Sequence, residues 1–231
     1  MTAAPPLPEP RPDCPLCPRL AAFRQQNRAA YPAFHNAPVP SFGGRDAELL
    51  IVGLAPGLKG ANRTGRPFTG DFAGDLLYRT LLDLGLAVGN YDRRPDDGLR
   101  LRRCRVSNAV RCVPPENKPT PAEVRTCGAF LAAEIAGLTK LKAILALGRV
   151  AHDAVLSALG SRRASARFSH GAVHDLPKGL RLVDSYHCSR YNTQTGVLTE
   201  TMFRDAVAAA RACVERPQAA SGQRSRGSAR R

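Results

Sequence analysis

The sequence predicts an α/β fold: a three-layer α/β/α sandwich around a central, mainly parallel, four-stranded sheet. Four short apolar runs end at glycine or polar residues, as strands buried on both faces of a parallel sheet do. Helical patterns lie between these runs. Polar and glycine-rich segments follow three of the runs, at the edge of the sheet where such folds bind ligands.

The predicted elements alternate along the chain. The strands are expected over residues 48–55, 105–110, 141–148 and 180–187. Leucines at roughly helical spacing after Asp71 predict the first intervening helix. The segment Thr120-Pro121-Ala122-Glu123 combines a capping box with proline at the first helical position, which predicts a helix to about Gly137. Two further helices are expected, one after Gly148 and one over about 198–215.

Length and composition indicate one domain, over residues 14–215, because 231 residues with 43% hydrophobic content suffice for one core. A flexible proline-rich segment is expected over 1–13 and a disordered basic tail over 216–231. The net charge is +15, and subtracting the five arginines of the tail leaves about +10 on the rest. A chain with this much positive charge suits a partner with dense negative charge, and nucleic acid is the leading candidate.

The chain begins without the apolar core of a signal peptide and contains no run of eighteen apolar residues. We therefore expect a soluble, cytoplasmic, nucleoid-associated protein that does not contact membranes. In that reducing compartment, disulfides are not expected among the seven cysteines.

Four of the cysteines form a candidate metal site. Cys14 and Cys17 are two residues apart, then 94 residues intervene, and Cys112 and Cys127 are separated by fourteen more. Four thiolates can bind a tetrahedral zinc ion or an iron–sulfur cluster, and the spacing does not choose between them. The other three are interpreted as small apolar side chains: Cys104, Cys188 and Cys213.

The loops carry a family resemblance. The segments "GLAPG", "NRTGRPFTGD", "NAVRCVPPENKP" and "SYHCSRYNTQTG", in this order, resemble the motifs of the family 5 uracil-DNA glycosylases, which are close to the iron–sulfur family 4 enzymes. The match spans about residues 14–202. By this resemblance the four cysteines bind a structural [4Fe-4S] cluster, Asn108 and Asn117 occupy positions tied to base reading and water placement, and His187 faces the uracil.

The chain departs from related glycosylases at two places. Cys188 stands where proline is frequent after the histidine. Leu54 and Ala55 stand where other uracil-DNA glycosylases carry a polar residue that positions water, although this apolar stretch is itself the family 5 pattern. The nearest carboxylate in the motif is Asp71, so we expect either Asp71 or an asparagine, namely Asn117, to hold the water.

The chemistry of base removal assigns roles to these residues. The enzyme must rotate the damaged nucleotide out of the duplex, and Phe68 can stack on the base while the Asn108 amide reads its edge. Bond cleavage leaves an anionic base that His187 can stabilise, and Asp71 can hold the attacking water or stabilise the sugar cation. Simpler interpretations remain: Phe68 as an ordinary core residue, His187 as a chain-turn cap, and Asp71 as a helix N-cap.

The remaining candidates concern binding. The base pocket is expected to include Gly53, Leu54 and Ala55, because glycine lets the backbone approach a ligand closely. Arg63 is expected to contact DNA, and Arg190 or Tyr191 to fill the space left by the flipped base. We expect a monomer that acts on double-stranded and single-stranded DNA containing uracil, and also on other deaminated bases such as hypoxanthine.

Two alternative functions would also explain part of the sequence. A zinc nucleobase deaminase needs His-x-Glu followed by Pro-Cys-x-x-Cys, and neither His170 nor His187 begins such a motif. A noncatalytic DNA-binding module with a four-cysteine zinc or iron–sulfur site would explain the charge and the cysteines, but it leaves Asn108, Asn117 and His187 without a role.

Overall fold

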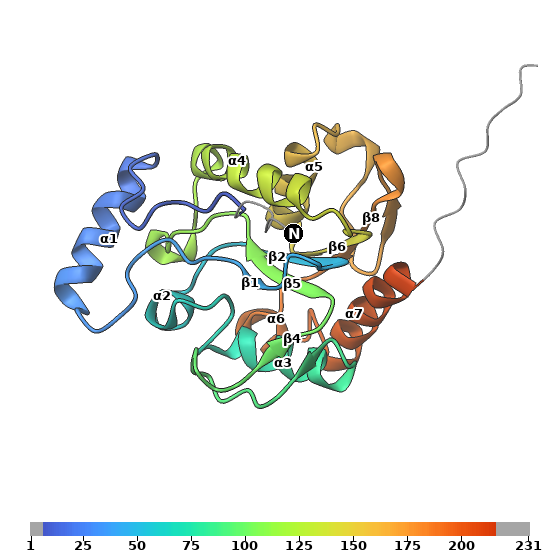
Figure 1. The fold of residues 1–231 in the computed structure, drawn as a ribbon, viewed down its shortest axis with the longest axis horizontal. Helices are drawn as coiled ribbons and strands as arrows, with labels where there is room; N and C mark the ends of the chain where they lie inside the picture. Colours follow the sequence, from blue (N-terminus) through green and yellow to red (C-terminus); the bar gives the residue numbers. More distant parts are fainter. Residues whose placement is uncertain (1–6, 216–231) are drawn as a thin grey trace, which may run out of the picture.

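A computed structural model, which describes residues 7–215, has a six-stranded central sheet between two layers of helices (Figure 1). The strand order is β1-β5-β2-β6-β8-β7. The four inner strands are parallel and confirm the four predicted runs: β2 (Leu49–Gly53), β5 (Cys104–Asn108), β6 (Ala143–Leu147) and β8 (Arg181–Ser185).

The sheet is wider than the four strands that the sequence predicts. Two short antiparallel strands extend its edges, β1 (Phe42–Gly43) beside β5 and β7 (Val173–Asp175) beside β8. They contain only two and three residues, too few for a periodic apolar pattern to develop. A separate hairpin pairs β3 (Ala87–Val88) with β4 (Arg100–Leu101).

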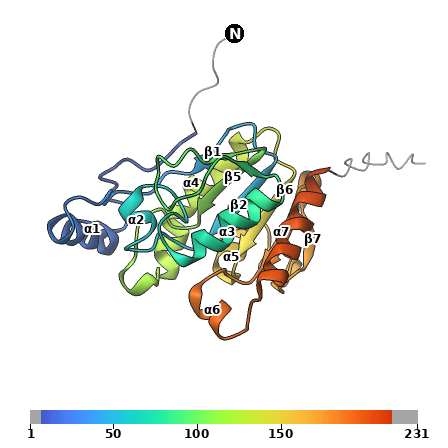
Figure 2. The same ribbon diagram turned by 90° about the horizontal axis from the view of Figure 1, so that it is seen from below.

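The helices form the two outer layers. The layer formed by α4 (Pro121–Gly137) and α5 (Arg149–Ala158) covers one face of the sheet, and α3 (Phe72–Asp83) with α7 (Glu200–Glu215) covers the other (Figure 2). These four helices are the ones predicted. The remaining helical segments are α1 (Pro18–Ala30), α2 (Ala61–Thr64), α6 (Arg190–Gln194) and the 3-10 turns η1 (Pro115–Asn117), η2 (Arg163–Ser165) and η3 (Pro177–Gly179).

Side chains of the inner strands point alternately to the two faces of the sheet, and this divides the core into two clusters. Leu49 and Ile51 of β2 belong to the cluster that α3 and α7 complete, whereas Leu50 and Val52 belong to the cluster under α4 and α5. All four side chains are fully buried. Because successive residues of a strand point to opposite faces, a continuous apolar run is what a strand between two helical layers requires.

The strand order directs the functional loops to one edge. The chain passes from β2 to β5 on one side and then crosses to β6 and β8 on the other. The direction of winding therefore reverses around β2, and ligands of open α/β sheets bind outside the carboxyl ends of the strands at such a point.

A buried ionic network ties β5, the loop after it and α4 together. The Arg111 guanidinium donates to Oε2 of Glu134 at 2.7 Å, and both side chains are 1% exposed. Arg105 donates to the other carboxylate oxygen at 2.6 Å, and the Ser107 hydroxyl donates to Oε2 at 2.8 Å. Burial raises the pKa of Glu134, but the positive charge of Arg111 and the hydrogen bonds outweigh it and hold that pKa below its usual value.

The N-terminal segment joins this network. The Glu9 carboxylate accepts a hydrogen bond from Arg111 at 2.9 Å and contacts Arg105 at 3.4 Å. Residues 7–13 belong to the segment predicted to be flexible, and within it Glu9 is held by two buried arginines. Residues 1–6 and the predicted basic tail, 216–231, lie outside the described residues. Within 7–215, no helix is both long and apolar enough to cross a bilayer.

We predict that Arg111→Met lowers the free energy of unfolding by about 3–5 kcal/mol, because it leaves the Glu134 carboxylate buried without its main counter-charge. Denaturant unfolding measures the change. The matched control is Arg79→Met, which breaks an exposed pair with Glu200 whose side chains are 59% and 72% exposed. It should stay within about 1 kcal/mol of the wild type. Equal effects of the two substitutions would contradict the role of the buried pair.

Candidate functional site

A pocket opens at the carboxyl edge of the sheet and brings together five residues singled out by the sequence: Ala55, Phe68, Asp71, Asn108 and His187. They come from the loop after β2, the segment before α3, the end of β5 and the loop after β8. The pocket is completed by small or rigid residues: Pro56, Gly57, Ala61 and Ala73.

Gly53 makes room for two of these side chains. It pairs with Asn108 across β2 and β5, and a β-carbon at Gly53 would lie 2.4 Å from Cζ of Phe68 and 2.5 Å from Oδ1 of Asn108. Both contacts are closer than real β-carbons tolerate, so any larger residue displaces the ring or the amide. Gly53 therefore lies behind the pocket wall and leaves space for the side chains of Phe68 and Asn108.

Asn108 presents an unused acceptor to the pocket. The residue is 2% exposed, and its Oδ1 has no hydrogen-bond partner among the described residues. A buried acceptor without a partner costs about 1–3 kcal/mol, so such an atom in a pocket indicates a ligand that donates to it. Asn108 is thus suited to an N–H group.

Phe68 is held in a strained conformation beside the histidine. Its φ is +53°, in the left-handed region that residues other than glycine rarely adopt. Its ring stacks on the His187 imidazole, with centroids 6.0 Å apart and planes 27° apart. The Tyr91 hydroxyl donates to the Phe68 carbonyl at 3.3 Å and accepts from Gly70 N–H at 3.4 Å, which fixes the turn on both sides of Thr69.

A buried cation supports this turn from behind. Arg66 is bidentate to Asp97, with nitrogen–oxygen distances of 2.8 and 2.7 Å, and both side chains are nearly inaccessible. Although burial raises the pKa of Asp97, the hydrogen bond and charge of Arg66 lower it to about 2. The guanidinium also lies over three aromatic rings at 5.1–5.8 Å, those of Phe42, Tyr78 and Tyr91. No sequence motif pointed to this support.

Asp71 both caps α3 and lines the pocket. Its Oδ1 accepts from Gly74 N–H at 3.1 Å, which confirms the N-cap interpretation. Its other oxygen faces Gly57 and Gly60, where β-carbons would lie 3.2 and 2.3 Å from it. Burial raises the pKa of Asp71 above its usual value. The carboxyl group can therefore exchange a proton closer to neutral pH than an exposed aspartate can.

His187 follows β8 and is held through its backbone. Nδ2 of Asn192 in α6 donates to the His187 carbonyl at 2.8 Å. Burial lowers the pKa of the imidazole to about 4, so the ring is neutral at physiological pH. A neutral imidazole has one N–H, which can donate to an oxygen that becomes negative during a reaction.

The residue after the histidine is fully buried. Cys188 is 0% exposed and its thiol donates to the Ala73 carbonyl at 3.5 Å, which ties the His187 loop to α3. Cys104 is also buried, with its thiol donating to the Leu86 carbonyl at 3.2 Å. Cys213 is partly buried against the same core cluster. The three cysteines assigned as apolar side chains thus lie in or against the core.

The other four cysteines line one cavity beside α1, although they come from distant parts of the chain: Cys14, Cys17, Cys112 and Cys127. Arg24 reaches into it, donating to Sγ of Cys112 at 3.7 Å and to the Cys14 carbonyl at 2.9 Å. The Arg111 N–H donates to Sγ of Cys127 at 3.3 Å. Donors of this kind stabilise thiolates and cluster sulfur.

Burial favours the protonated, neutral form of these thiols. Burial first, and then the nearby Cys127, raises the pKa of Cys17 to about 11 and that of Cys112 to about 12. The thiols alone therefore stay protonated at neutral pH, and a metal would convert them to thiolates. Four thiolates that line one cavity suit a tetrahedral zinc ion or an iron–sulfur cluster.

Ala55 forms a wall shared by the pocket and the cysteine cavity. It lines the pocket and also packs against the apolar cluster of Leu20, Val110 and Cys127. The loops behind it are joined where the strands end, since Ala109 N–H donates to the Gly53 carbonyl and Val110 N–H to the Leu54 carbonyl. The two sites therefore share the same pair of loops.

Other predicted residues lie outside the pocket. Leu54 is half-buried and does not line it, and Asn117 is exposed on η1 with φ of +57°. Arg63 lies against Gly70, and the Arg190 guanidinium lies over the Phe72 ring at 5.6 Å. These two arginines thus contact the two residues that neighbour Asp71 in the chain, Gly70 and Phe72. Tyr191, next to Arg190, is 73% exposed.

Comparison with known proteins gives consistent matches. The family model described as Uracil DNA glycosylase superfamily matches residues 40–211. The chain is 47% identical over 195 residues to a protein of Thermus thermophilus named Type-5 uracil-DNA glycosylase, covering 82% of this chain and 89% of that protein. A Type-5 uracil-DNA glycosylase of Pyrobaculum aerophilum is 40% identical over 81% of this chain and 83% of its own. A Type-4 uracil-DNA glycosylase of Archaeoglobus fulgidus is 31% identical over 64% of this chain and 69% of its own.

We predict that the His187 imidazole remains neutral until the pH falls to about 4. Histidine-selective NMR titration measures this, with the His187 signals assigned by their loss in His187→Gln. Because the unfolded chain takes up this proton near pH 6.5 and the folded chain does not, stability should fall as pH decreases from about 6.5 toward 4. That part of the decrease should be missing in His187→Gln. Titration of His187 near 6.5 would contradict its desolvated position.

Proposed function

Because the chain belongs to the uracil-DNA glycosylase superfamily, we propose that it is a DNA repair enzyme that flips uracil out of DNA and hydrolyses its N-glycosidic bond, leaving an abasic site. The single observation that carries the proposal is the unpartnered Oδ1 of Asn108 in a pocket that also holds Phe68 and His187. The 47% identity to a protein named Type-5 uracil-DNA glycosylase favours an enzyme over a noncatalytic DNA-binding module.

The pocket supports recognition of a pyrimidine edge. The N3–H of uracil is a donor and would satisfy Oδ1 of Asn108, and the amide N–H of the same side chain can donate to O4. The ring of Phe68 supplies a stacking face whose position is fixed by the Tyr91 hydroxyl and by the absence of a β-carbon at Gly53. In this proposal the buried acceptor selects the base and the aromatic ring orients it.

His187 would stabilise the leaving base. As the glycosidic bond breaks, negative charge develops on the uracil oxygen, and the N–H of the neutral imidazole can donate to it. A neutral donor suits this role because it forms the hydrogen bond without transferring a full positive charge into the buried pocket. The hydrogen bond strengthens as the charge develops, so it favours the transition state over the bound substrate.

Asp71 would hold the attacking water. It is the carboxylate that lines the pocket, and its raised pKa is compatible with accepting a proton during attack on the sugar. Asn117, which the sequence also suggested for this role, is exposed on the loop after β5. It would contribute from the DNA-facing side of that loop.

DNA would contact the surface around the pocket. Arg63 and Arg190 lie on the two sides of the Asp71 turn and can bind the phosphates that flank a flipped nucleotide. The exposed ring of Tyr191 is placed beside Arg190, where it could fill the space in the duplex. We propose a cytoplasmic monomer that works at the nucleoid on double-stranded and single-stranded DNA.

The four cysteines would hold a [4Fe-4S] cluster. The donors from Arg24 and from the Arg111 backbone fit such a group. It would supply a structural cross-link between the start of α1, the loop after β5 and α4. The proposed chemistry at His187 and Asp71 involves no step at these thiols.

The function is tested by His187→Ala on uracil-containing DNA. Single-turnover cleavage should fall by about 10²–10³, while affinity for abasic DNA changes far less, because the lost hydrogen bond matters mainly in the transition state. A His35→Ala variant, which removes a histidine that does not line the pocket, serves as the control. Equal losses in turnover and product binding would overturn the role of His187, and no uracil release by the wild type would overturn the function.

We predict that the protein purified without air contains about four iron and four sulfide ions and absorbs visible light, and that Cys112→Ala loses both ions and unfolds more easily. Cys104→Ala changes a buried cysteine outside the cavity and should retain the iron. Metal analysis and thermal unfolding make the comparison. Stoichiometric zinc without sulfide in an active enzyme would contradict the proposal.

We also predict activity on hypoxanthine, because its N1–H and O6 offer Asn108 the same donor and acceptor as uracil and the apolar wall at Ala55 adds no further hydrogen-bond requirement. Release of uracil and hypoxanthine should be measured for the wild type, Asp71→Asn and Asn117→Ala. Asparagine keeps the N-cap of α3 but removes the carboxylate, so Asp71→Asn should lose turnover on both bases without loss of fold. Strict selectivity for uracil would refute the predicted range of substrates. Wild-type rates in both variants would show that neither residue positions the attacking water.

A further inference from the structure

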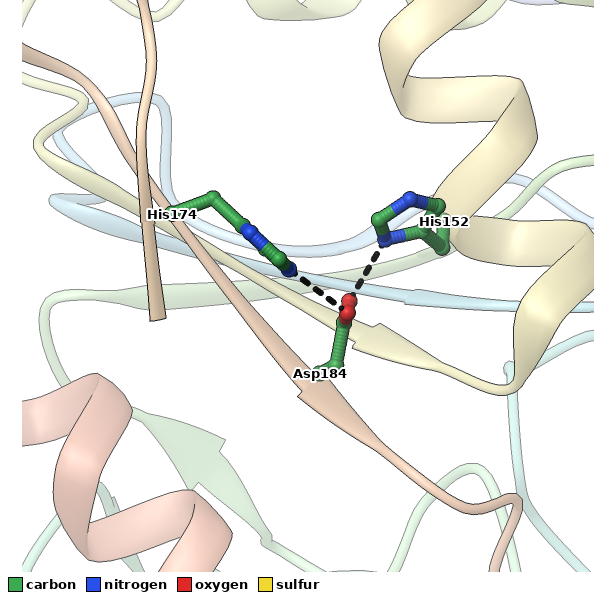
Figure 3. A group of neighbouring side chains, drawn as sticks. All are labelled: His152, His174 and Asp184. Atoms are coloured by element: carbon green, nitrogen blue, oxygen red, sulfur yellow. Dashed lines mark hydrogen bonds and ion pairs between the residues drawn. The ribbon is translucent and has the colours of Figure 1, made fainter. Parts of the chain in front are cut away.

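A second cluster of ligand-type side chains lies apart from both sites described above. His152 of α5, His174 of β7 and Asp184 of β8 converge on one point (Figure 3). Their ligand atoms all lie within 4.8 Å of one another. None of the three residues lines the base pocket or the cysteine cavity.

The fold explains why they meet. Leu182 of β8 is packed in the cluster under α4 and α5, so Asp184, two residues later, faces the same helical layer. His174 pairs with Leu182 across β7 and β8 and is therefore a diagonal neighbour of Asp184 on that face. His152 lies in the first turns of α5, which packs on β6, the strand next to β8.

The two imidazoles point at different oxygens of one buried carboxylate. Nδ1 of His152 is 2.7 Å from Oδ1 of Asp184, and Nε2 of His174 is 2.9 Å from Oδ2. The side chains of His152 and Asp184 are 1% and 0% exposed, whereas that of His174 is 16% exposed. The cluster is thus enclosed on the helix side and reachable past His174.

Surrounding groups orient the ligands as they do in metal sites. The second nitrogen of His152 lies 3.0 Å from the Ala166 carbonyl, so its N–H can donate there and leave Nδ1 facing Asp184, where Nδ1 can bind a metal once it has lost its proton. The Ser169 N–H donates to Oδ2 of Asp184 at 3.3 Å and fixes the carboxylate. Histidines that bind metals in proteins usually donate their other N–H to a carbonyl or carboxylate in this way.

We propose that His152, His174 and Asp184 form a zinc site distinct from the four cysteines, with water as the fourth ligand. Two imidazoles and one carboxylate are a common ligand set for this ion. The ion takes the place of the proton between His152 and Asp184, and that proton leaves to solvent. The edge strand β7 has only three residues. The ion would attach this strand, and the loop that contains Ala166, to α5 and β8. The proposal does not depend on the glycosylase function.

The test uses the full chain with its cysteine site filled as purified. Zinc titration against a chromophoric chelator should reveal one added site per chain, and His174→Gln and Asp184→Asn should each weaken it at least about a hundredfold. His35→Gln replaces a histidine whose ring contacts only a backbone carbonyl and should bind zinc as the wild type does.

Spectroscopy on the wild type identifies the ligands without any substitution. Added cobalt should give visible bands without sulfur charge transfer, and X-ray absorption of the added zinc should show nitrogen and oxygen at about 2.0–2.1 Å without sulfur at about 2.3 Å. A sulfur signature, or binding that survives both His174→Gln and Asp184→Asn, would assign the ion to the cysteines and overturn the proposal. Absence of added zinc at micromolar concentration would overturn it as well, leaving a hydrogen-bonded brace.

Discussion

The buried pair of Arg111 and Glu134 is the constraint on which both loop sites depend. It fixes the backbone immediately after β5 to the last turn of α4, at a depth where water does not compete for either charge. Asn108 lies three residues before Arg111, and Cys112 lies next to it. Buried charged groups are stable only where they are paired and hydrogen-bonded. This pair therefore leaves the short segment between Asn108 and Cys112 little freedom to shift.

That segment serves two neighbouring sites at once. Its first residue presents an amide to the pocket, and its last presents a thiol to the cysteine cavity. Ala55, from the loop after β2, lies between the two sites: it lines the pocket and packs against the apolar cluster beside the cysteine cavity. Changes in the cysteine cavity would reach the pocket through a few ångströms of packed backbone, without any larger movement of the domain.

The sequence predicted the parts of the molecule whose signals are local. The four inner strands were readable because burial on both faces demands continuous apolar runs, and α4 was readable from its capping box, which Thr120 and Glu123 form. Asp71, Asn108 and His187 could be singled out because each follows or precedes such an element. The edge strands β1 and β7 are too short to leave a pattern. The partnership of Arg66 with Asp97, and of Glu9 with Arg111, joins residues 31 and 102 positions apart, which no local pattern can reveal.

The position of the cysteines along the chain has a consequence for biosynthesis. The cavity needs Cys14 and Cys17 from the start of the domain and Cys127 from the middle of it. A ribosome must therefore extend the nascent chain beyond α4 before these thiols can meet, and the loop between them closes at an entropic cost that grows with its length. Until then α1, whose buried Leu20 packs against Val110 and Cys127, has no surface to dock on. The first helix thus docks only after the ribosome has made α4, which ends at Gly137.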